Sequence, residues 1–147
     1  MKTKLLLVFM VMFVCATFVL AGETDRDGRF IAYDNGTVLD TKTNLMWAAK
    51  DNGSQIDWQS AKSYCENYNE AGYKDWRMPT LEELSGLYDA SIDKKFHLTR
   101  LIKLSWGNQW TSETIGSSSR TFHFKTGAYG SIKQSNMISV LPVRSNK

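Results

Sequence analysis

The first apolar stretch of the chain is an uncharged run over residues 5–20, rich in Leu, Val, Phe and Met. Lys2 and Lys4 precede it, and the small residue Ala21 follows it. This order is typical of a secretory signal peptide. We therefore expect the first 21 residues to be a signal peptide that is cleaved after Ala21. The alternatives are an uncleaved membrane anchor, for which the run is short, and lipidation at Cys15.

Short apolar segments separated by turn residues come next, over 29–33, 37–40 and 45–49. Asn35-Gly36 lies between the first two, and this dipeptide between apolar runs is typical of a hairpin turn. The pattern predicts a three-stranded antiparallel meander. Residues 22–28 are polar, and we expect them to form a flexible lead-in.

A helical pattern follows the predicted meander. Asp57 is placed to cap the helix, because a carboxylate accepts hydrogen bonds from the free amides of a first turn. Gly72 is placed to end it in a left-handed conformation. The apolar residues recur every three or four positions, which puts them on one face of the helix: Trp58, Ala61, Cys65 and Tyr68.

A second, shorter helix is predicted by the capping box of Thr80 and Glu83, with Pro79 preventing an earlier start. Residues 89–108 read as a long loop with a short helix over Leu98–Lys103. Strands are then predicted at the following segments: 110–112, 121–124 and 139–141. The whole is an α+β domain over residues 29–145, whose terminal strands share one sheet.

The charges are distributed unevenly. The 147 residues carry 18 basic and 15 acidic side chains, a net charge of +3. Residues 22–93 hold 7 basic and 14 acidic residues, whereas residues 94–147 hold 9 basic residues and Glu113 alone. Such asymmetry is typical of a polyanion-binding surface. The alternative is that the two halves pack together and pair their charges.

No catalytic constellation is evident. His97 and His123 lie far apart without metal-ligand spacing, and the chain has no nucleophile elbow or phosphate-binding glycine loop. We expect no metal, no cofactor, no nucleic-acid partner and no enzymatic activity. Cys65 would be the single cysteine of the cleaved protein, so that no internal disulfide could form.

The candidate binding site is a basic segment interleaved with apolar residues. On a helix, Lys95, Arg100 and Lys103 would share a face, and sulfates and phosphates attract such clusters. The alternative is a solvated loop with no ligand. The five residues of the segment are Lys94, Lys95, His97, Arg100 and Lys103.

A series of short sequence motifs, in a fixed order along the chain, resembles the pattern of a known family. The motifs are Asp34-Asn35-Gly36-Thr37-Val38, Thr43-Asn44-Leu45-Met46-Trp47, Asp57-Trp58-Gln59-Ser60-Ala61 with Cys65, Asp75-Trp76-Arg77-Met78-Pro79-Thr80, Trp110-Thr111-Ser112 and Pro142-Val143-Arg144. Over residues 29–145 the chain resembles the Legionella collagen-like protein C-terminal domain family. The signature residues are Trp47, Trp58, Cys65, Asp75, Trp76, Arg77, Pro79, Trp110 and Arg144.

The resemblance implies an exported C-type-lectin-like domain, which in the namesake trimerises and binds sulfated glycans. This chain lacks a collagen-like repeat, and Pro142 stands where many relatives have the cysteine that pairs with the one at Cys65. From the residues themselves we expect most signature tryptophans to be core, because aromatic side chains dominate core packing. We expect Arg77 and Asp75 to brace the chain between the helices.

We therefore expect an exported, periplasmic or extracellular, non-catalytic domain that binds an anionic, sulfated glycan. One alternative is a structural component of the envelope or a pilus that binds an envelope protein. A third hypothesis, an enzyme like those that generate formylglycine, requires a pair of cysteines. We expect no stable membrane span after cleavage, and homo-oligomerisation is left open.

Overall fold

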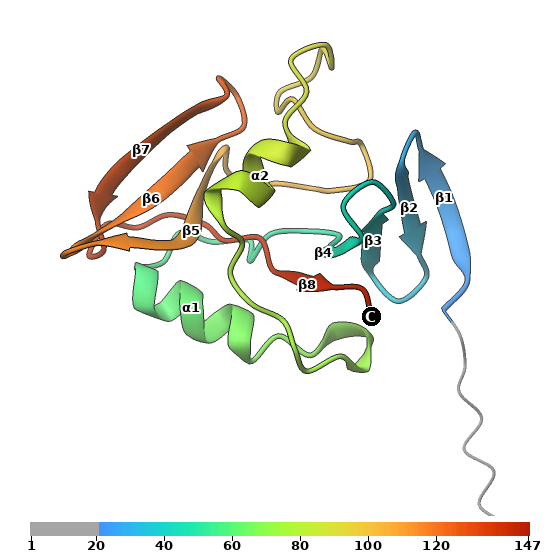
Figure 1. The fold of residues 1–147 in the computed structure, drawn as a ribbon, viewed down its shortest axis with the longest axis horizontal. Coiled ribbons are helices and arrows are strands. Elements are labelled where there is room, and N and C mark those ends of the chain that lie inside the picture. Colours follow the sequence, from blue (N-terminus) through green and yellow to red (C-terminus); the bar gives the residue numbers. More distant parts are fainter. Residues whose placement is uncertain (1–20) are drawn as a thin grey trace, which may run out of the picture.

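The computed structural model describes residues 21–147, so the predicted signal peptide lies, apart from Ala21, outside the described residues. Two antiparallel sheets and two helices form a mixed α+β domain, which confirms the predicted class (Figure 1). No helix of the described part is long and apolar enough to cross a membrane. The elements are β1 (Glu23–Asp27), β2 (Phe30–Tyr33), β3 (Thr37–Asp40), β4 (Leu45–Ala48), α1 (Trp58–Glu66), α2 (Leu81–Leu87), β5 (Asn108–Ile115), β6 (Ser118–His123), β7 (Ala128–Lys133) and β8 (Val143–Ser145).

The first sheet has the strand order β1-β2-β3-β4-β8. The predicted meander is confirmed as β2–β4, and Gly36 occupies its turn with a φ of 80°, a conformation that favours glycine. The C-terminal strand β8 pairs with β4, with Met46 opposite Arg144. The N-terminal meander and the end of the chain therefore share one sheet, as predicted.

The prediction of a flexible lead-in over residues 22–28 is wrong, because residues 23–27 form the edge strand β1. Four of its five residues are exposed, and an edge strand of this kind needs no apolar pattern. Hydrogen bonds from outside the strand hold it. Asp27 Oδ2 accepts from Thr99 Oγ1 at 2.6 Å and from the Arg100 amide at 3.1 Å.

Both predicted helices form where their caps are. Asp57 Oδ1 accepts from the Ser60 amide at 2.9 Å, and Thr80 and Glu83 make both bonds of the capping box. Helix α1 ends at Glu66, earlier than predicted, and Gly72 instead ends a separate 3-10 turn, Glu70–Gly72. Tyr68 is buried although it lies beyond the helix.

The second sheet contains β5, β6 and β7 in that order. Its last strand was not predicted, because Ala128–Lys133 lacks an apolar alternation and is largely exposed. The predicted strand over 139–141 is wrong in position: Ser139 makes only an isolated bridge with Gln109, and β8 begins at Val143.

The short helix predicted over Leu98–Lys103 is also wrong. A single turn is closed by the Ile102 amide, which donates to Thr99 O at 3.4 Å, but the backbone groups of Lys103 bond to another segment. The Lys103 amide donates to Ala49 O at 2.8 Å, and the Lys103 carbonyl accepts from the Asp51 amide at 3.1 Å. The segment therefore forms an irregular turn that reaches the end of β4 only at Lys103, and the basic residues do not share a helix face.

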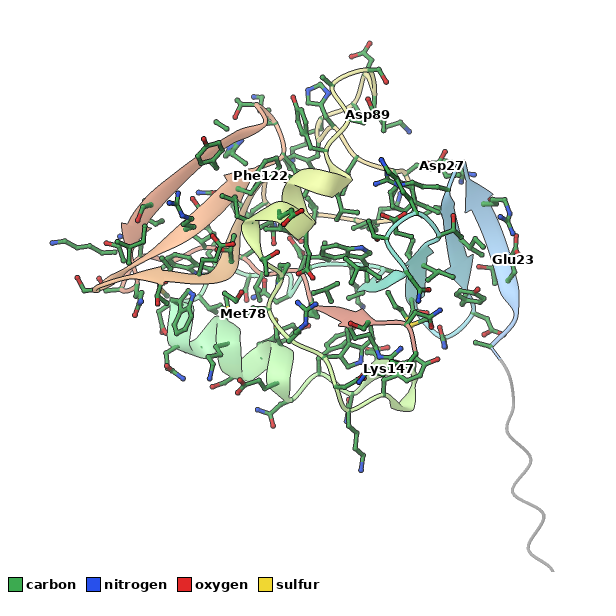
Figure 2. The ribbon with its side chains drawn as sticks, viewed as in Figure 1. Glu23, Asp27, Met78, Asp89, Phe122 and Lys147 are labelled. Carbon is green, nitrogen blue, oxygen red and sulfur yellow. The ribbon has the colours of Figure 1, made fainter. Side chains whose placement is uncertain are left out.

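The core lies between the two sheets and the helices. Trp47, Trp76 and Trp110 are buried, which confirms the expectation for most signature tryptophans. Trp58 is half-buried, with its indole N–H donating to Thr111 O at 2.8 Å. Phe122, labelled in Figure 2 beside α2, joins the larger cluster from the second sheet. The core is thus built from both sheets.

Two signature ion pairs join the segment between the helices to the rest, as expected. Arg144 is buried; its Nε donates to Asp75 Oδ1 at 2.6 Å, and its guanidinium lies 3.8 Å from the centre of the Tyr73 ring. Arg77 makes two bonds to the Glu83 carboxylate, at 2.6 and 2.8 Å. The Arg144–Asp75 pair fixes β8 against residues 73–78.

Cys65 is fully buried on α1, and burial raises the pKa of its thiol. A thiol reagent reacts with the thiolate, so we expect Cys65 to be labelled only after denaturant is added. Replacing it with Ala removes one sulfur from a packed core and should cost about 1 kcal/mol of unfolding free energy. Timed labelling with and without urea is the measurement, and rapid labelling of the native protein would contradict the expectation.

The Arg144 hydrogen bonds hold the pKa of Asp75 below its ordinary value of 3.8. Because the pKa is lowered on folding, the stabilisation is present above about pH 4 and is lost as the pH falls through the folded-state pKa. Asp75→Asn should destabilise the protein by roughly 1–3 kcal/mol at pH 7, a figure reduced for the half-exposed carboxylate.

Urea unfolding at pH 7 and pH 2 measures this effect. The difference in unfolding free energy between wild type and Asp75→Asn should be smaller at pH 2 than at pH 7. An equal difference at the two pH values would show that Arg144 does not act through the charge of the Asp75 carboxylate. Glu82→Gln is the control, because the exposed Glu82 side chain has no partner within residues 21–147.

Candidate functional site

The structure separates the five residues of the predicted basic segment. Lys94 and Lys95 are exposed on the irregular stretch after α2, with Lys95 Nζ 5.0 Å from the centre of the Phe96 ring. His97 is half-buried; its Nδ1 lies 2.6 Å from Ile92 O, and its ring packs against Tyr88. His97 is therefore occupied in holding this stretch together.

Arg100 is already paired with a carboxylate. Its Nη1 and Nη2 donate to Asp25 at 2.5 and 2.8 Å, and Nη2 also donates to Arg26 O at 3.0 Å. The Arg100 hydrogen bond lowers the pKa of Asp25 to about 2. At this point the basic part of the chain, residues 94–147, contacts the acidic part, residues 22–93. This contact agrees with the alternative interpretation of the charge asymmetry, in which the two parts pair their charges. Arg100 thus fixes β1.

Lys103 has a different neighbour, because it forms a parallel β-bridge with Lys50. Both lysines are exposed, and neither makes an ion pair with any residue that the structure describes. Partners in a bridge project to the same side, and like charges placed directly opposite each other repel. An anion bound between the two ammonium groups would relieve that repulsion.

A buried carboxylate next to Lys50 fixes the loop that follows Lys103. Asp51 is 4% exposed, and its Oδ2 accepts from the Ser105 amide at 2.8 Å and the Trp106 amide at 3.4 Å. Its Oδ1 accepts from the Gly53 amide at 3.1 Å. Asp51 therefore connects the backbones that carry Lys50, Lys103 and Trp106, because its amide also donates to Lys103 O at 3.1 Å.

Trp106 presents an apolar surface on this fixed loop. Trp106 is 48% exposed, whereas three of the other four tryptophans in the chain are buried. An exposed indole is unusual for a side chain that normally dominates the core. We call Lys50, Lys103 and Trp106 together the Lys-Trp surface. Its parts can attract an anion and offer a flat ring for stacking.

Sequence reasoning found Lys103 but missed the other two members. Lys50 lies far from Lys103 in the chain, and only the β-bridge brings them together. Trp106 carried a weak signal, because it stands between Ser105 and Gly107 and outside any apolar periodicity. That context favours an exposed position over a core one.

Two cavities lie elsewhere. Asp27 and Asp89, labelled in Figure 2, line a cavity of about 410 Å³ together with Arg29. Arg29 is committed to Asp40, 2.9 Å away, and to Gly86 O, 2.6 Å away. A groove of about 320 Å³ is lined by apolar and paired charged side chains, among them Trp58, Met78 and Arg77. In residues 21–147 no group of His, Cys, Asp and Glu is placed to hold a metal.

Comparison with models of protein families gives a match over most of the chain. The family model described as the Lcl C-terminal domain matches residues 36–144, a range that contains every signature residue from Trp47 to Arg144. No curated protein matches the chain.

The role of Asp51 can be tested by Asp51→Asn, which keeps the shape and removes the charged acceptor. An amide in this place cannot accept from every donor, so the Ser105 amide loses a charge-assisted bond, at a cost of about 1–3 kcal/mol. We expect faster hydrogen exchange of the Ser105 and Gly53 amides, measured by NMR. Glu82→Gln is again the control, and unchanged exchange in Asp51→Asn would contradict the role.

Proposed function

Because this chain belongs to the Lcl C-terminal domain family, we propose that it is an exported, non-catalytic binding domain for an anionic, sulfated glycan. The domain acts by charge complementarity and stacking, and no bond of the ligand is broken. The proposed location is the periplasm or the extracellular space, and this part rests on the signal-like pattern of residues 1–21.

The observation that supports the proposal is the Lys-Trp surface. Lys50 and Lys103 are bridge partners, and neither is paired with a carboxylate of residues 21–147. A sulfate or carboxylate between them would gain two attractive contacts and remove one repulsive contact. The sugar ring that carries the sulfate could then lie on the exposed Trp106 indole. Because Asp51 fixes the loop, little conformational entropy is lost on binding.

The finer fold assignment, a C-type-lectin-like domain, is part of this proposal. It is supported by strands from both ends of the chain in one sheet, by two helices between the sheets in chain order, and by a long irregular segment before β5. The Lys-Trp surface includes the end of that segment. Segments of this kind, held on a rigid scaffold, commonly carry binding residues.

The state of Cys65 supports a binding role over the formylglycine-type hypothesis. A nucleophilic cysteine needs an accessible thiolate. Cys65 is fully buried with a raised pKa, and it is the single cysteine of residues 21–147.

The test is retention on a dextran sulfate column at rising salt, with neutral dextran as the matched matrix. We expect retention at low salt that falls steeply between 0.1 and 1 M, because the Debye length shrinks from about 10 Å to about 3 Å. Lys103→Glu and Lys50→Glu should each weaken binding at least about tenfold, the equivalent of 1.4 kcal/mol. Trp106→Ala should weaken binding to sulfated dextran and leave the salt dependence unchanged.

Lys125→Glu is the matched control, because Lys125 is an exposed lysine in the β6–β7 turn without an ion pair in the described chain. It makes the same charge change away from the Lys-Trp surface. Equal losses in Lys125→Glu and Lys103→Glu would show diffuse attraction and no site. No retention of the wild type at low salt would overturn the proposed function.

A further inference from the structure

The two sheets have four outer edges, and the structure protects three of them. At β1, four of five residues are charged and the register with β2 shifts between Glu23 and Asp25. Charges and a local irregularity both hinder pairing with another strand. Arg100 also lies against this strand through its bonds to Asp25.

Two further edges are covered by the chain itself. At β8, Val143 exchanges both backbone hydrogen bonds with Arg77, at 2.9 and 3.0 Å. At β5, the Trp110 amide donates to Ser139 O at 2.9 Å and the Ser112 amide donates to Pro79 O at 2.8 Å. Neither strand can accept a new neighbour along its length without losing these bonds.

The edge of β7 is different. It pairs with β6 in unbroken register over six residues, and no strand of residues 21–147 pairs with its other side, the outer edge of the second sheet in Figure 1. At its end, the Lys133 carbonyl accepts from the Asn136 amide at 2.9 Å. The strand has no proline, and its single charge, Lys133, stands at the end. Tyr129 is 67% exposed, the highest value among the large apolar side chains of the described chain. Apart from Lys133 at its end, the strand has none of the usual protections of an edge.

We propose that β7 is a self-association edge, on which β7 of a second copy of this chain pairs antiparallel about a two-fold axis. The pairing joins two three-stranded sheets into one continuous sheet. With the axis at Gly130, each Tyr129 stands opposite Ser131 and each Ala128 opposite Ile132. Large residues then meet small ones on both faces, and Lys133 falls opposite Gly127 with no like charge facing it.

This self-complementarity is the reason to assign a second copy as the occupant. A two-fold interface requires one patch to match itself, and the β7 sequence does so about its central glycine. A single strand pair buries less surface than a standard stable interface, so the association is weak and depends on concentration. It does not depend on the proposed glycan site, although pairing two copies would make that site bivalent.

Disulfide trapping with Gly130→Cys is the direct test. Opposed residues of an antiparallel pair have Cα atoms about 4.5–5.5 Å apart, within the reach of a disulfide. A Cβ at Gly130 meets no atom within 4 Å, and the backbone is not left-handed there, so the monomer accepts the change. Gly86→Cys on α2 is the matched control, since Gly86 is exposed and meets the same two conditions.

Under mild oxidation, we expect Gly130→Cys to form a covalent dimer at least tenfold faster than Gly86→Cys, as seen on a non-reducing gel. The buried Cys65 does not contribute in the folded protein. Equal rates for the two variants would overturn the proposal.

Sedimentation at rising protein concentration tests the pairing without a disulfide. We expect the wild type to shift toward a dimer, and Gly130→Lys to lose the shift because two lysines would face each other across the axis. Gly86→Lys should keep it, and so should Lys103→Glu, which separates this result from failure of the glycan site. A wild type that stays monomeric, as expected if the edge served an extended peptide of another protein, would overturn the proposal.

Discussion

The buried guanidinium of Arg144 is the constraint on which the arrangement of the domain depends. A buried charge is tolerated only with a partner, because removing it from water costs several kcal/mol. Asp75 supplies that partner at 2.6 Å, and Tyr73 covers the guanidinium face. The requirement fixes the end of the chain against the segment between the helices, and it places β8 beside β4. Both sheets then enclose the tryptophan core.

The sequence predicted those elements that local rules determine. Asp57 and the Thr80–Glu83 pair could be recognised as caps because capping acts within four residues, and Asn35-Gly36 marked its turn for the same reason. Strands β1 and β7 were missed although each pairs with its neighbour in the chain, and the conformation of residues 98–103 depends on bonds from Lys103 to residues 49 and 51. Their own residues have no periodicity that favours one structure over another.

The candidate site was likewise predicted only in part from the sequence. Sequence identifies cations, but it does not identify their partners. Arg100 is held by Asp25 from the opposite end of the charge distribution, whereas Lys103 meets Lys50, a residue of the acidic half. In the basic segment, Arg100 is therefore committed to the fold, whereas Lys103 has no ion pair within residues 21–147. Only the tertiary structure separates these two roles. It also adds Trp106 to the candidate site, because the Trp106 amide donates to the Asp51 carboxylate and so holds the loop beside Lys50.

The position of β8 also constrains how the chain folds. Leu141 and Val143 have no exposed surface, and Arg144 contacts Asp75 and Met46, which lie 69 and 98 residues earlier in the chain. Loop closure over such separations is slow, and these contacts cannot form before residues 141–144 have been synthesised. During synthesis, the first four strands and both helices leave the ribosome without the strand that completes their core. Folding of this domain is therefore completed only when β8 has left the ribosome and docked beside β4.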